Sequence, residues 1–507
     1  MKTIIFNKEI GELTISSSLC YISAIDFDKY RCLKNIMVDE RNGFYSSENG
    51  VLFDENKTKL IKFPDHHTKI RYVIPNSVIY IGPDAFKNCS ILTSITIPSS
   101  ITEIGDCAFY GCFNLSSIII PTSVVEISGC AFCDCSSLVS ITIPSSVTYI
   151  GNFAFSNCSN LSSIIIPDSV IEIGKCGFKN CTSLTSITIP SSVVEIDDCA
   201  LLNCSGLVSI NVDEKNIHYS SENGVLFDIN KTKLIKFPSS TAETNYNIPS
   251  SVTYIGERAF SDCYNLSYIT IPSSVSKIGE CAFSDCCNLS SIIIPNFVRY
   301  ILQFTFSNCS SLTSITIPIS VEYISSNAYS ECSNLTSNTI PNSVEEISSY
   351  TFRNCSSLVS IIIPSSVAYI GDYAFSNCSN LTSINIPSSV EEISSDAFRN
   401  CSSLTSIIIP SSVTKIGNRA FGGCSNLTHI DIPSSVTKIG DYAFFNCFNL
   451  SSITITNQES SNNKNIFCYC DDLTIILDNS EVLKQCQKIL PKYKNIIFHS
   501  DKTKMNN

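Results

Sequence analysis

The sequence is poor in charge and in several residue types on which binding and catalytic sites commonly depend. Its 507 residues include no tryptophan, three methionines and five histidines, and only 15% are Asp, Glu, Lys or Arg. Lys and Arg number 33 against 45 Asp and Glu, which gives a net charge of −12. The chain has no block of Lys or Arg, so it lacks the basic surface expected of a nucleic-acid-binding protein. We therefore expect no nucleic-acid partner.

Long apolar runs are also missing. No stretch approaches the roughly 18 apolar residues of a membrane-spanning helix, so we expect no transmembrane segment. The N-terminal MKTIIFNKEIGELT contains an apolar run of three residues. That run is too short for the core of a secretory signal peptide, and no export signal is recognisable.

Catalytic and metal-binding motifs are absent as well. The sequence contains no HExxH, GxSxG or P-loop pattern, and nothing places a nucleophile beside a base. The histidines are scattered, and no Cys or His clusters recur at matched metal-ligand spacing. We expect no enzymatic activity, no cofactor and no metal site.

What the sequence does have is a repeat. Prolines recur every 23 residues in two series, at 75, 98, 121, 144, 167 and 190 and at 249, 272, 295, 318, 341, 364, 387, 410 and 433. They lead units with the frame Leu-x-x-Ile-x-Ile-Pro-x-x-Val-x-x-Ile-Gly-x-x-Ala-Phe-x-x-Cys. One such unit cannot bury its apolar face alone, whereas stacked copies bury a continuous core. The period therefore predicts an elongated or horseshoe-like repeat solenoid.

Each part of the frame predicts a local structure. Alternating isoleucines such as Ile95 and Ile97 indicate a short parallel strand that ends at the proline. The spacing of Ala85, Phe86 and Cys89 predicts one face of a single helical or 3-10 turn. Glycine before that turn, as at Gly82, suits a tight bend.

Two longer repeats interrupt the series. Both contain YSSENGVLF followed by a polar turn and LIKF, and their pairs Asn49-Gly50 and Asn223-Gly224 predict a small hairpin grown out of the coil. The tail SEVLKQCQKIL, residues 480–490, predicts a capping helix. The expected organisation is a cap and degenerate repeat (1–38), a long repeat (39–74), six standard repeats (75–212), a second long repeat (213–248), nine standard repeats (249–455), and a degenerate repeat with the cap helix (456–507).

Cysteine is the most conspicuous residue of the frame. Sixteen of the 27 cysteines fall in one column from Cys89 to Cys470, always three residues after the phenylalanine slot. Cysteine is small, apolar and often buried, so we interpret the column as packing. Side chains that point the same way in successive coils disfavour disulfide geometry, and we expect reduced thiols. Asn-Cys-Ser sequons such as Asn88 and Asn157 fit turn asparagines, and would be glycosylated only in a secretory lumen.

Two features stand out from the regular frame. Asn338 replaces a strand isoleucine, so a buried amide must find partners or weaken the stack locally. Tyrosines gather just after the second long repeat, in outward positions of neighbouring units, where the acidic run of the preceding repeats ends. We predict that a partner-binding strip contains Tyr254, Tyr268, Tyr300 and Tyr323.

The repeated IPxxVxxIGxxAFxxCxxL and the YSSENGVLF units resemble the BspA-like branch of the leucine-rich repeat proteins, over about residues 16–478. The resemblance implies a leucine-rich-repeat solenoid of short parallel strands and short helical turns. It also implies a cell-surface or secreted protein that adheres to host molecules or to other cells.

Three functions follow as hypotheses. The leading one is a non-enzymatic recognition or adhesion protein for a host or cell-surface protein or glycoprotein. The missing export signal and the many thiols favour an intracellular, cytoplasmic protein scaffold instead. Rows of outward Ser and Thr would suit a flat lattice such as ice, although Ile119 and Ile165 interrupt the Thr row.

Overall fold

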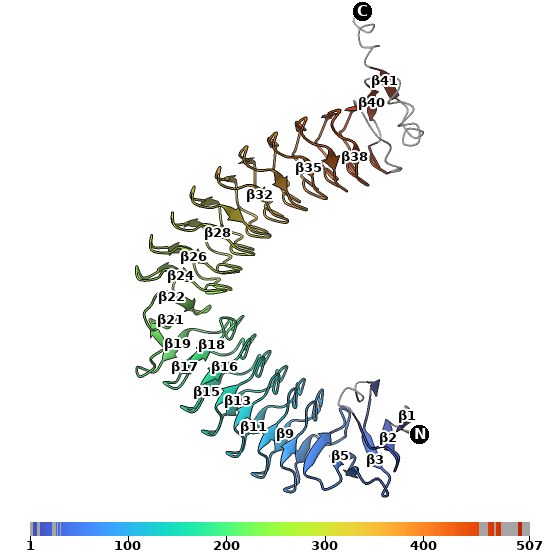
Figure 1. Ribbon diagram of the computed structural model, residues 1–507, viewed down its shortest axis with the longest axis vertical. Helices are drawn as coiled ribbons and strands as arrows, with labels where there is room; N and C mark the ends of the chain where they lie inside the picture. Colours follow the sequence, from blue (N-terminus) through green and yellow to red (C-terminus); the bar gives the residue numbers. More distant parts are fainter. Residues whose placement is uncertain are drawn as a thin grey trace, which may run out of the picture. The chain divides into compact units, whose positions relative to one another are not determined.

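The structure is a computed structural model that describes residues 4–7, 11–22, 27, 29–30, 32–455, 465–470, 473–477 and 495–498. It divides into two compact units, Met1–Ala242 and Glu243–Asn507, which we call unit 1 and unit 2. Within each unit the chain winds into stacked coils, one coil for each sequence repeat (Figure 1). The predicted repeat solenoid is confirmed in both units.

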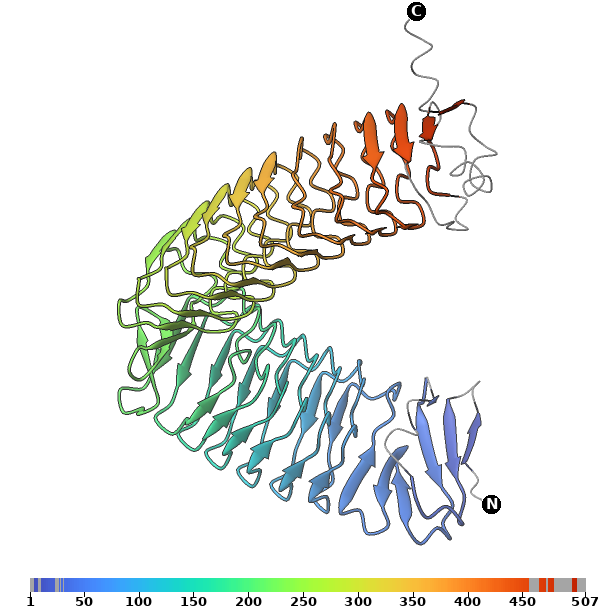
Figure 2. The same cartoon turned by 45° about the horizontal axis from the view of Figure 1, so that its top comes forward.

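The Ile-x-Ile segments form the predicted parallel strands, which we call the first sheet; they appear as rows of arrows in Figure 2. In unit 1, Ile118 lies directly opposite Ile141 of the next coil. Both isoleucines are buried and the residues that flank them are exposed, as a strand with one inward face requires. The strands are β7 (Arg71–Val73), β9 (Ser94–Thr96), β11 (Ser117–Ile119), β13 (Ser140–Thr142), β15 (Ser163–Ile165), β17 (Ser186–Ile189) and β19 (Ser209–Val212).

A second parallel sheet, which the sequence analysis did not predict, lies five residues after each proline. Its strands have two residues, of which the second is a buried isoleucine such as Ile127 or Ile150. They pair with the same step of one coil, Glu126 opposite Tyr149. In unit 1 they are β8 (Tyr80–Ile81), β10 (Glu103–Ile104), β12 (Glu126–Ile127), β14 (Tyr149–Ile150), β16 (Glu172–Ile173) and β18 (Glu195–Ile196).

Unit 2 repeats this plan. Its first-sheet strands are β23 (Asn245–Asn247), β25 (Tyr268–Thr270), β27 (Ser291–Ile293), β29 (Ser314–Thr316), β31 (Ser337–Thr339), β33 (Ser360–Ile362), β37 (His429–Ile432) and β39 (Ser452–Ile455). Its second-sheet strands are β24 (Tyr254–Ile255), β26 (Lys277–Ile278), β28 (Tyr300–Ile301), β30 (Tyr323–Ile324), β32 (Glu346–Ile347), β34 (Tyr369–Ile370), β35 (Glu392–Ile393), β36 (Lys415–Ile416) and β38 (Lys438–Ile439).

The segment around Ala-Phe is buried as predicted but is not helical. Asp84 and Asn88 have φ of 54° and 61°, and a right-handed helix cannot contain such residues. The Phe86 N–H therefore donates to Ala108 of the next coil, at 2.8 Å, rather than to a carbonyl four residues earlier. Backbone hydrogen bonds between Ala-Phe segments of neighbouring coils therefore take the place of the expected helical or 3-10 turn.

The glycine before this segment serves close approach rather than a left-handed bend. Gly151 does not have a positive φ, but a Cβ there would lie 2.7 Å from the Ile127 carbonyl oxygen of the preceding coil. Contacts below 3 Å require the backbone to shift. Ser128 fills the equivalent slot in the preceding coil, where its hydroxyl donates to the Ile104 carbonyl at 2.5 Å.

The predicted hairpins are confirmed in the two long repeats. β4 (Tyr45–Glu48) pairs antiparallel with β5 (Val51–Asp54), and β5 pairs antiparallel with β6 (Lys59–Lys62). Asn49 and Gly50 have φ of 50° and 81°, which type I′ turns require. The twin repeat forms β20 (Tyr219–Glu222), β21 (Val225–Asp228) and β22 (Lys233–Lys236) in the same way.

The ends of the chain carry further strands. β1 (Ile4–Asn7) is antiparallel to β2 (Glu12–Ile15), which is parallel to β3 (Asn35–Val38). At the other end β39 pairs parallel with β40 (Thr474–Leu477), and β40 with β41 (Asn495–Phe498). The predicted cap helix at 480–490 lies outside the described residues.

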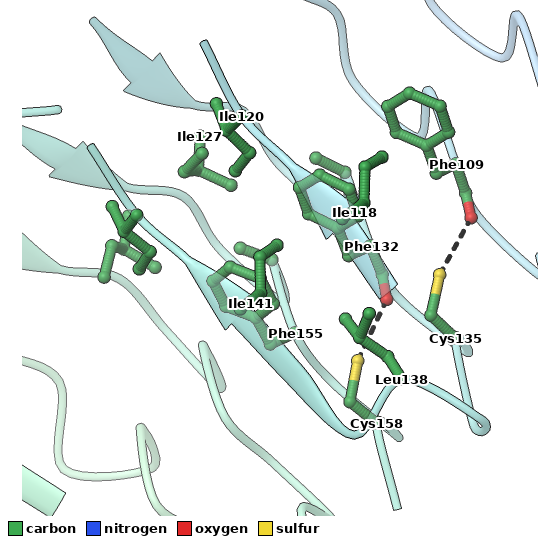
Figure 3. Close-up of a cluster of buried hydrophobic side chains, with 14 of the residues drawn as sticks. Phe109, Ile118, Ile120, Ile127, Phe132, Cys135, Leu138, Ile141, Phe155 and Cys158 are labelled. Carbon is green, nitrogen blue, oxygen red and sulfur yellow. Dashed lines mark hydrogen bonds between the residues drawn. The ribbon is translucent and has the colours of Figure 1, made fainter. Parts of the chain in front are cut away.

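Aromatic rings form a stack through the core of each unit. Phe109, Phe132 and Phe155 lie with ring centroids 5.2 and 5.5 Å apart and nearly parallel planes (Figure 3). In unit 2 the stack includes Tyr329, which is fully buried in the place of a phenylalanine. Because each ring contacts the next, the repeat buries one continuous core, as the period predicts.

The cysteine column packs beside this stack, and each thiol also makes a hydrogen bond. The Cys158 Sγ donates to the Phe132 carbonyl oxygen of the preceding coil at 3.2 Å, and Cys135 donates to Phe109 at the same distance (Figure 3). In unit 2, Cys378 donates to Phe352 in the same way. The 26 cysteines within the described part of the chain are free thiols. The packing interpretation therefore holds, and the S–H donor explains why cysteine occupies a slot that alanine would fill less well.

Asn338 occupies the buried strand position that the sequence assigns to it. It is 6% exposed and lies opposite Ile361. Its Oδ1 accepts the Thr339 N–H at 2.8 Å, but its Nδ2 has no hydrogen-bond partner among the described residues. A buried donor without a partner costs about 1–3 kcal/mol.

Candidate functional site

The outward side chains of each unit form columns, because the same repeat position returns at every coil. Three columns are candidates for recognition: the exposed residues of the first sheet, the first residue of each second-sheet strand, and a position two residues before the stacked aromatic ring. We call the last one the turn column. The predicted tyrosines fall in two of these columns.

Tyr300 and Tyr323 are brought together. They begin β28 and β30, which are neighbouring strands of the second sheet, and they lie directly opposite each other. Tyr300 is half exposed, and Tyr323 is partly buried, with its hydroxyl accepting a hydrogen bond from Ser348 at 3.3 Å. The pair presents two adjacent amphipathic rings with little side-chain freedom to lose on binding.

Tyr254 and Tyr268 are placed differently. Tyr254 begins β24 in the second-sheet column, and the Lys277 ammonium of the next coil lies 4.3 Å from its ring centroid. Tyr268 begins β25 and is exposed on the first sheet, between Asn245 and Ser291. The four tyrosines therefore do not form a single strip: three belong to the second sheet and Tyr268 to the first.

Two acidic residues on the second-sheet side of unit 2 form ion pairs with cations of neighbouring coils. In the second-sheet column, Lys415 contacts Glu392 of the preceding coil at 2.5 Å. One position earlier in the repeat, Arg299 forms an ion pair with Glu322 of the next coil. The Glu322 and Glu392 carboxylates are therefore compensated, whereas Glu346 of the same column lies opposite Tyr369.

The same column in unit 1 is acidic. Glu172 lies directly opposite Glu195, and Tyr149 lies between Glu126 and Glu172. Partial burial and these carboxylates raise the pKa of Tyr149. Burial and Glu103 likewise raise the pKa of Tyr80. Like charges opposite each other on a sheet are destabilising, so this column favours a cationic neighbour.

The first sheet exposes isoleucines on its outward face. Ile119 and Ile165 are 76% and 81% exposed in unit 1, and Ile362 and Ile408 are 67% and 77% exposed in unit 2. Between them stand Ser and Thr residues, so the face is uncharged over much of its length. Isolated exposed apolar residues are ordinary, but a register-aligned row is a surface suited to contact with another macromolecule.

The turn column was missed by the sequence analysis. In the nine standard coils of unit 2 its residues have a positive φ, although several are bulky: Arg258, Cys281, Phe304, Asn327, Tyr350, Tyr373, Asp396, Arg419 and Tyr442. A left-handed conformation costs such residues about 1–2 kcal/mol each. The density of Tyr, Phe and Arg at one position of the GxxAF motif was the available signal.

The described residues contain no group of three or more His, Cys, Asp and Glu that could hold a metal ion. No helix among them has the length and apolar character needed to cross a bilayer.

Comparison with known proteins places the chain in a family. The family described as BspA type leucine rich repeat region matches residues 71–173, 148–248, 236–359 and 345–474. No curated protein matches the chain.

Solved structures agree with this assignment. A leucine rich cell surface protein from Faecalibacterium prausnitzii is 30% identical with a TM-score of 0.55, over 62% of this chain and 94% of that one. A leucine-rich repeat protein from Eubacterium ventriosum is 26% identical with a TM-score of 0.53, over 74% of this chain and 92% of that one. The chain thus belongs to the BspA-type leucine-rich repeat family.

Proposed function

We propose that this chain is a non-enzymatic recognition protein that binds a large protein or glycoprotein at a cell surface. The observation that carries the proposal is the alignment of equivalent outward side chains in successive coils. Because the same side-chain position returns at every coil, weak contacts add along an extended partner. The similarity to a leucine rich cell surface protein supports the surface location.

The contact zone we propose is the second-sheet column of unit 2 around Tyr300 and Tyr323, together with Tyr254 and the exposed first-sheet face that carries Tyr268. Aromatic residues are over-represented among the residues that dominate binding energy at interfaces. A standard interface buries about 800 Å² on each partner, which requires several adjacent coils. The partner is therefore a macromolecule rather than a small ligand.

The test is a pair of tyrosine substitutions. The double variant Tyr300→Ser and Tyr323→Ser should weaken binding to a partner captured by cross-linking at the surface of the native cells, by about ten-fold or more. The melting temperature should stay nearly unchanged, since neither ring belongs to the core. The matched control is Tyr80→Ser with Tyr149→Ser, the equivalent slots of unit 1, which should keep the affinity. If binding survives the first variant but is lost when the 213–248 repeat is shortened to standard length, the hairpin is the recognition element.

An intracellular scaffold is the second candidate, favoured by the 26 free thiols among the described residues. Extracellular proteins usually oxidise their cysteines. Protease treatment of intact cells distinguishes the two, because a surface protein is degraded and an intracellular one is protected.

A further inference from the structure

Most standard coils contain two left-handed positions, and different residue types occupy them. The position directly before the column cysteine holds Asn, Asp, Glu or Gly in almost every coil, and Asn and Gly tolerate a positive φ best. Its side chains also bond from coil to coil: the Asn377 Nδ2 donates to the Asn354 Oδ1 at 2.5 Å, and Asn400 donates to Asn377 at 2.8 Å. The residue types at this position therefore suit its left-handed backbone conformation.

The turn column of unit 2 accepts the same backbone conformation with residues that suit it poorly. Tyr350, Tyr373, Arg419 and Tyr442 have φ between 51° and 62°. Asn327 occupies the same column with φ of 59°, so asparagine fits this position in this unit. The bulky side chains are therefore not required by the turn, and strained positions of this kind commonly serve a binding role.

These side chains build a surface of rings and guanidinium groups. The rings of Tyr350 and Tyr373 stack with centroids 4.8 Å apart and planes at 7°. Arg353 lies 5.8 Å from the Tyr350 ring centroid, and Arg419 lies 5.8 Å from that of Tyr442. The guanidinium groups thus lie over or beside aromatic faces, which fixes their orientation.

A cavity of about 430 Å³ lies at the end of this row, lined by Arg399, Arg419, Tyr442 and Phe445. The nearly buried carboxylate of Asp396 holds Arg399 at 3.3 Å, while the Arg399 side chain stays 43% exposed. The Phe445 ring meets Tyr442 edge to face, with centroids 5.8 Å apart. Two guanidinium groups and two rings therefore surround one open site.

We propose that this cavity and the adjoining row of tyrosines bind a saccharide that carries carboxylate or sulfate groups. Guanidinium forks recognise such oxyanions through paired charge-assisted hydrogen bonds. Flat aromatic faces offer an apolar surface to the C–H face of a sugar ring, and their polar edges stay in contact with water. The volume lies within the usual range for small-ligand sites, about 300–1,000 Å³. Tyr350 and Tyr373 lie in neighbouring coils, and Tyr442 lies three coils beyond Tyr373, with Asp396 and Arg419 at this position in the coils between. The row therefore suits a ligand that extends over several sugar units.

This site is separate from the Tyr300 and Tyr323 strip, and it goes beyond the proposed function. Nucleic acid is the less suitable occupant, because a nucleic-acid groove needs many cations along its length and two arginines line this cavity. An acidic peptide such as polyglutamate offers carboxylates but no sugar C–H face to lie against the tyrosines.

Titration of the full chain tests the proposal. The probes are chondroitin sulfate and polygalacturonate oligosaccharides, which carry sulfate and carboxylate, with a neutral dextran oligosaccharide, polyglutamate and a single-stranded oligonucleotide as comparisons. We expect saturable binding to one or both acidic oligosaccharides that weakens as salt is added, and no comparable binding of the other three. Failure of both acidic saccharides to bind, or tighter binding of polyglutamate or the oligonucleotide, would overturn the proposal.

The double variant Arg419→Asn with Tyr442→Asn separates a binding role from a structural one. Asparagine suits the left-handed backbone, as Asn327 demonstrates, so the melting temperature should hold or rise while saccharide affinity falls by about ten-fold or more. Arg299→Gln, which removes an exposed arginine of the same unit on another side of the coil, should keep the affinity. A variant that loses melting temperature and keeps its affinity would show that the rings only support the stack. Retained binding of the protein partner by the same variant would leave the proposed function intact.

Discussion

The cores of unit 1 and unit 2 are built in the same way, whereas the residues on their surfaces differ. Both stack phenylalanine rings about one coil apart, and both align column cysteines that donate to the preceding coil. On the second sheet, unit 1 places Glu172 against Glu195, whereas unit 2 pairs Glu392 with Lys415. In the turn column, cysteines such as Cys107 and Cys130 in unit 1 correspond to tyrosines and arginines in unit 2. The repeat therefore fixes the inside of a coil and leaves the outward columns free to diverge.

The largest predicted effect is the unfolding of both units at alkaline pH. Burial raises the pKa of the column thiols, Cys158 and Cys378 among them, above the ordinary value of 9.0. The thiols of the unfolded chain ionise first as the pH rises, so the stability they contribute is complete below pH 9.0 and is lost above it. Each thiol lowers the free energy of unfolding by about 1.4 kcal/mol per pH unit in that window.

Circular dichroism followed from neutral to alkaline pH measures this effect. We expect both units to unfold by about pH 11, because many thiols act together. Thiol counting in denaturant without reductant is the control, and most column cysteines must react. If most are paired instead, both the reduced state and the alkaline transition are wrong.

A smaller effect concerns one coil of unit 2 that departs from the core pattern of both units. Unit 1 has isoleucine at the first strand slot, as at Ile118 and Ile141, and Asn338 stands there in unit 2. Asn338→Ile removes the buried Nδ2 that lacks a partner and should raise the free energy of unfolding of unit 2 by about 1–3 kcal/mol. Denaturant melts measure the gain. The reverse substitution, Ile118→Asn, is the matched control and should destabilise unit 1. A gain of zero or below at Asn338 would mean that the amide is satisfied in solution.

The smallest effect tests the charges of the second sheet. Glu195→Lys places a cation opposite Glu172 and should stabilise unit 1 by about 0.2–1 kcal/mol, more at low salt than at high salt. Glu392→Gln removes the ion pair with Lys415 and should cost unit 2 a similar small amount. Thermal melts at two salt concentrations measure both. A loss of stability on Glu195→Lys, or a gain on Glu392→Gln, would contradict the difference in charge compensation between the units.

Spacing alone predicted the features that recur from coil to coil. The proline period predicted the stack, alternating isoleucines predicted the first sheet, and Asn-Gly predicted the turns of the two hairpins, because each depends on local residue chemistry. Asn338 was found for the same reason, since one polar residue departs from an otherwise uniform column.

Features that depend on the neighbouring coil could not be predicted from spacing. The two-residue strands of the second sheet exist only because the next coil supplies their partners. The positive φ of residues such as Tyr373 has no signature in tyrosine itself. The glycine slot was expected to suit a tight bend, but spacing did not show that Gly151 also leaves room for the Ile127 carbonyl of the coil before it. The four predicted tyrosines lie on two different sheets, because Tyr268 and Tyr300 occupy different positions in the repeat.

The thiol bond from each column cysteine to the coil before it has a consequence for how such a protein can change in length. In most standard coils the column cysteine donates to the preceding coil and the carbonyl of the stacked aromatic residue accepts from the following one, as the bonds from Cys135 to Phe109 and from Cys158 to Phe132 illustrate. An additional coil copied into the gene therefore arrives with both halves of its connections, whichever standard coils it falls between. Lengthening by duplication leaves the core chemistry intact, and each new copy adds outward positions on which selection can act.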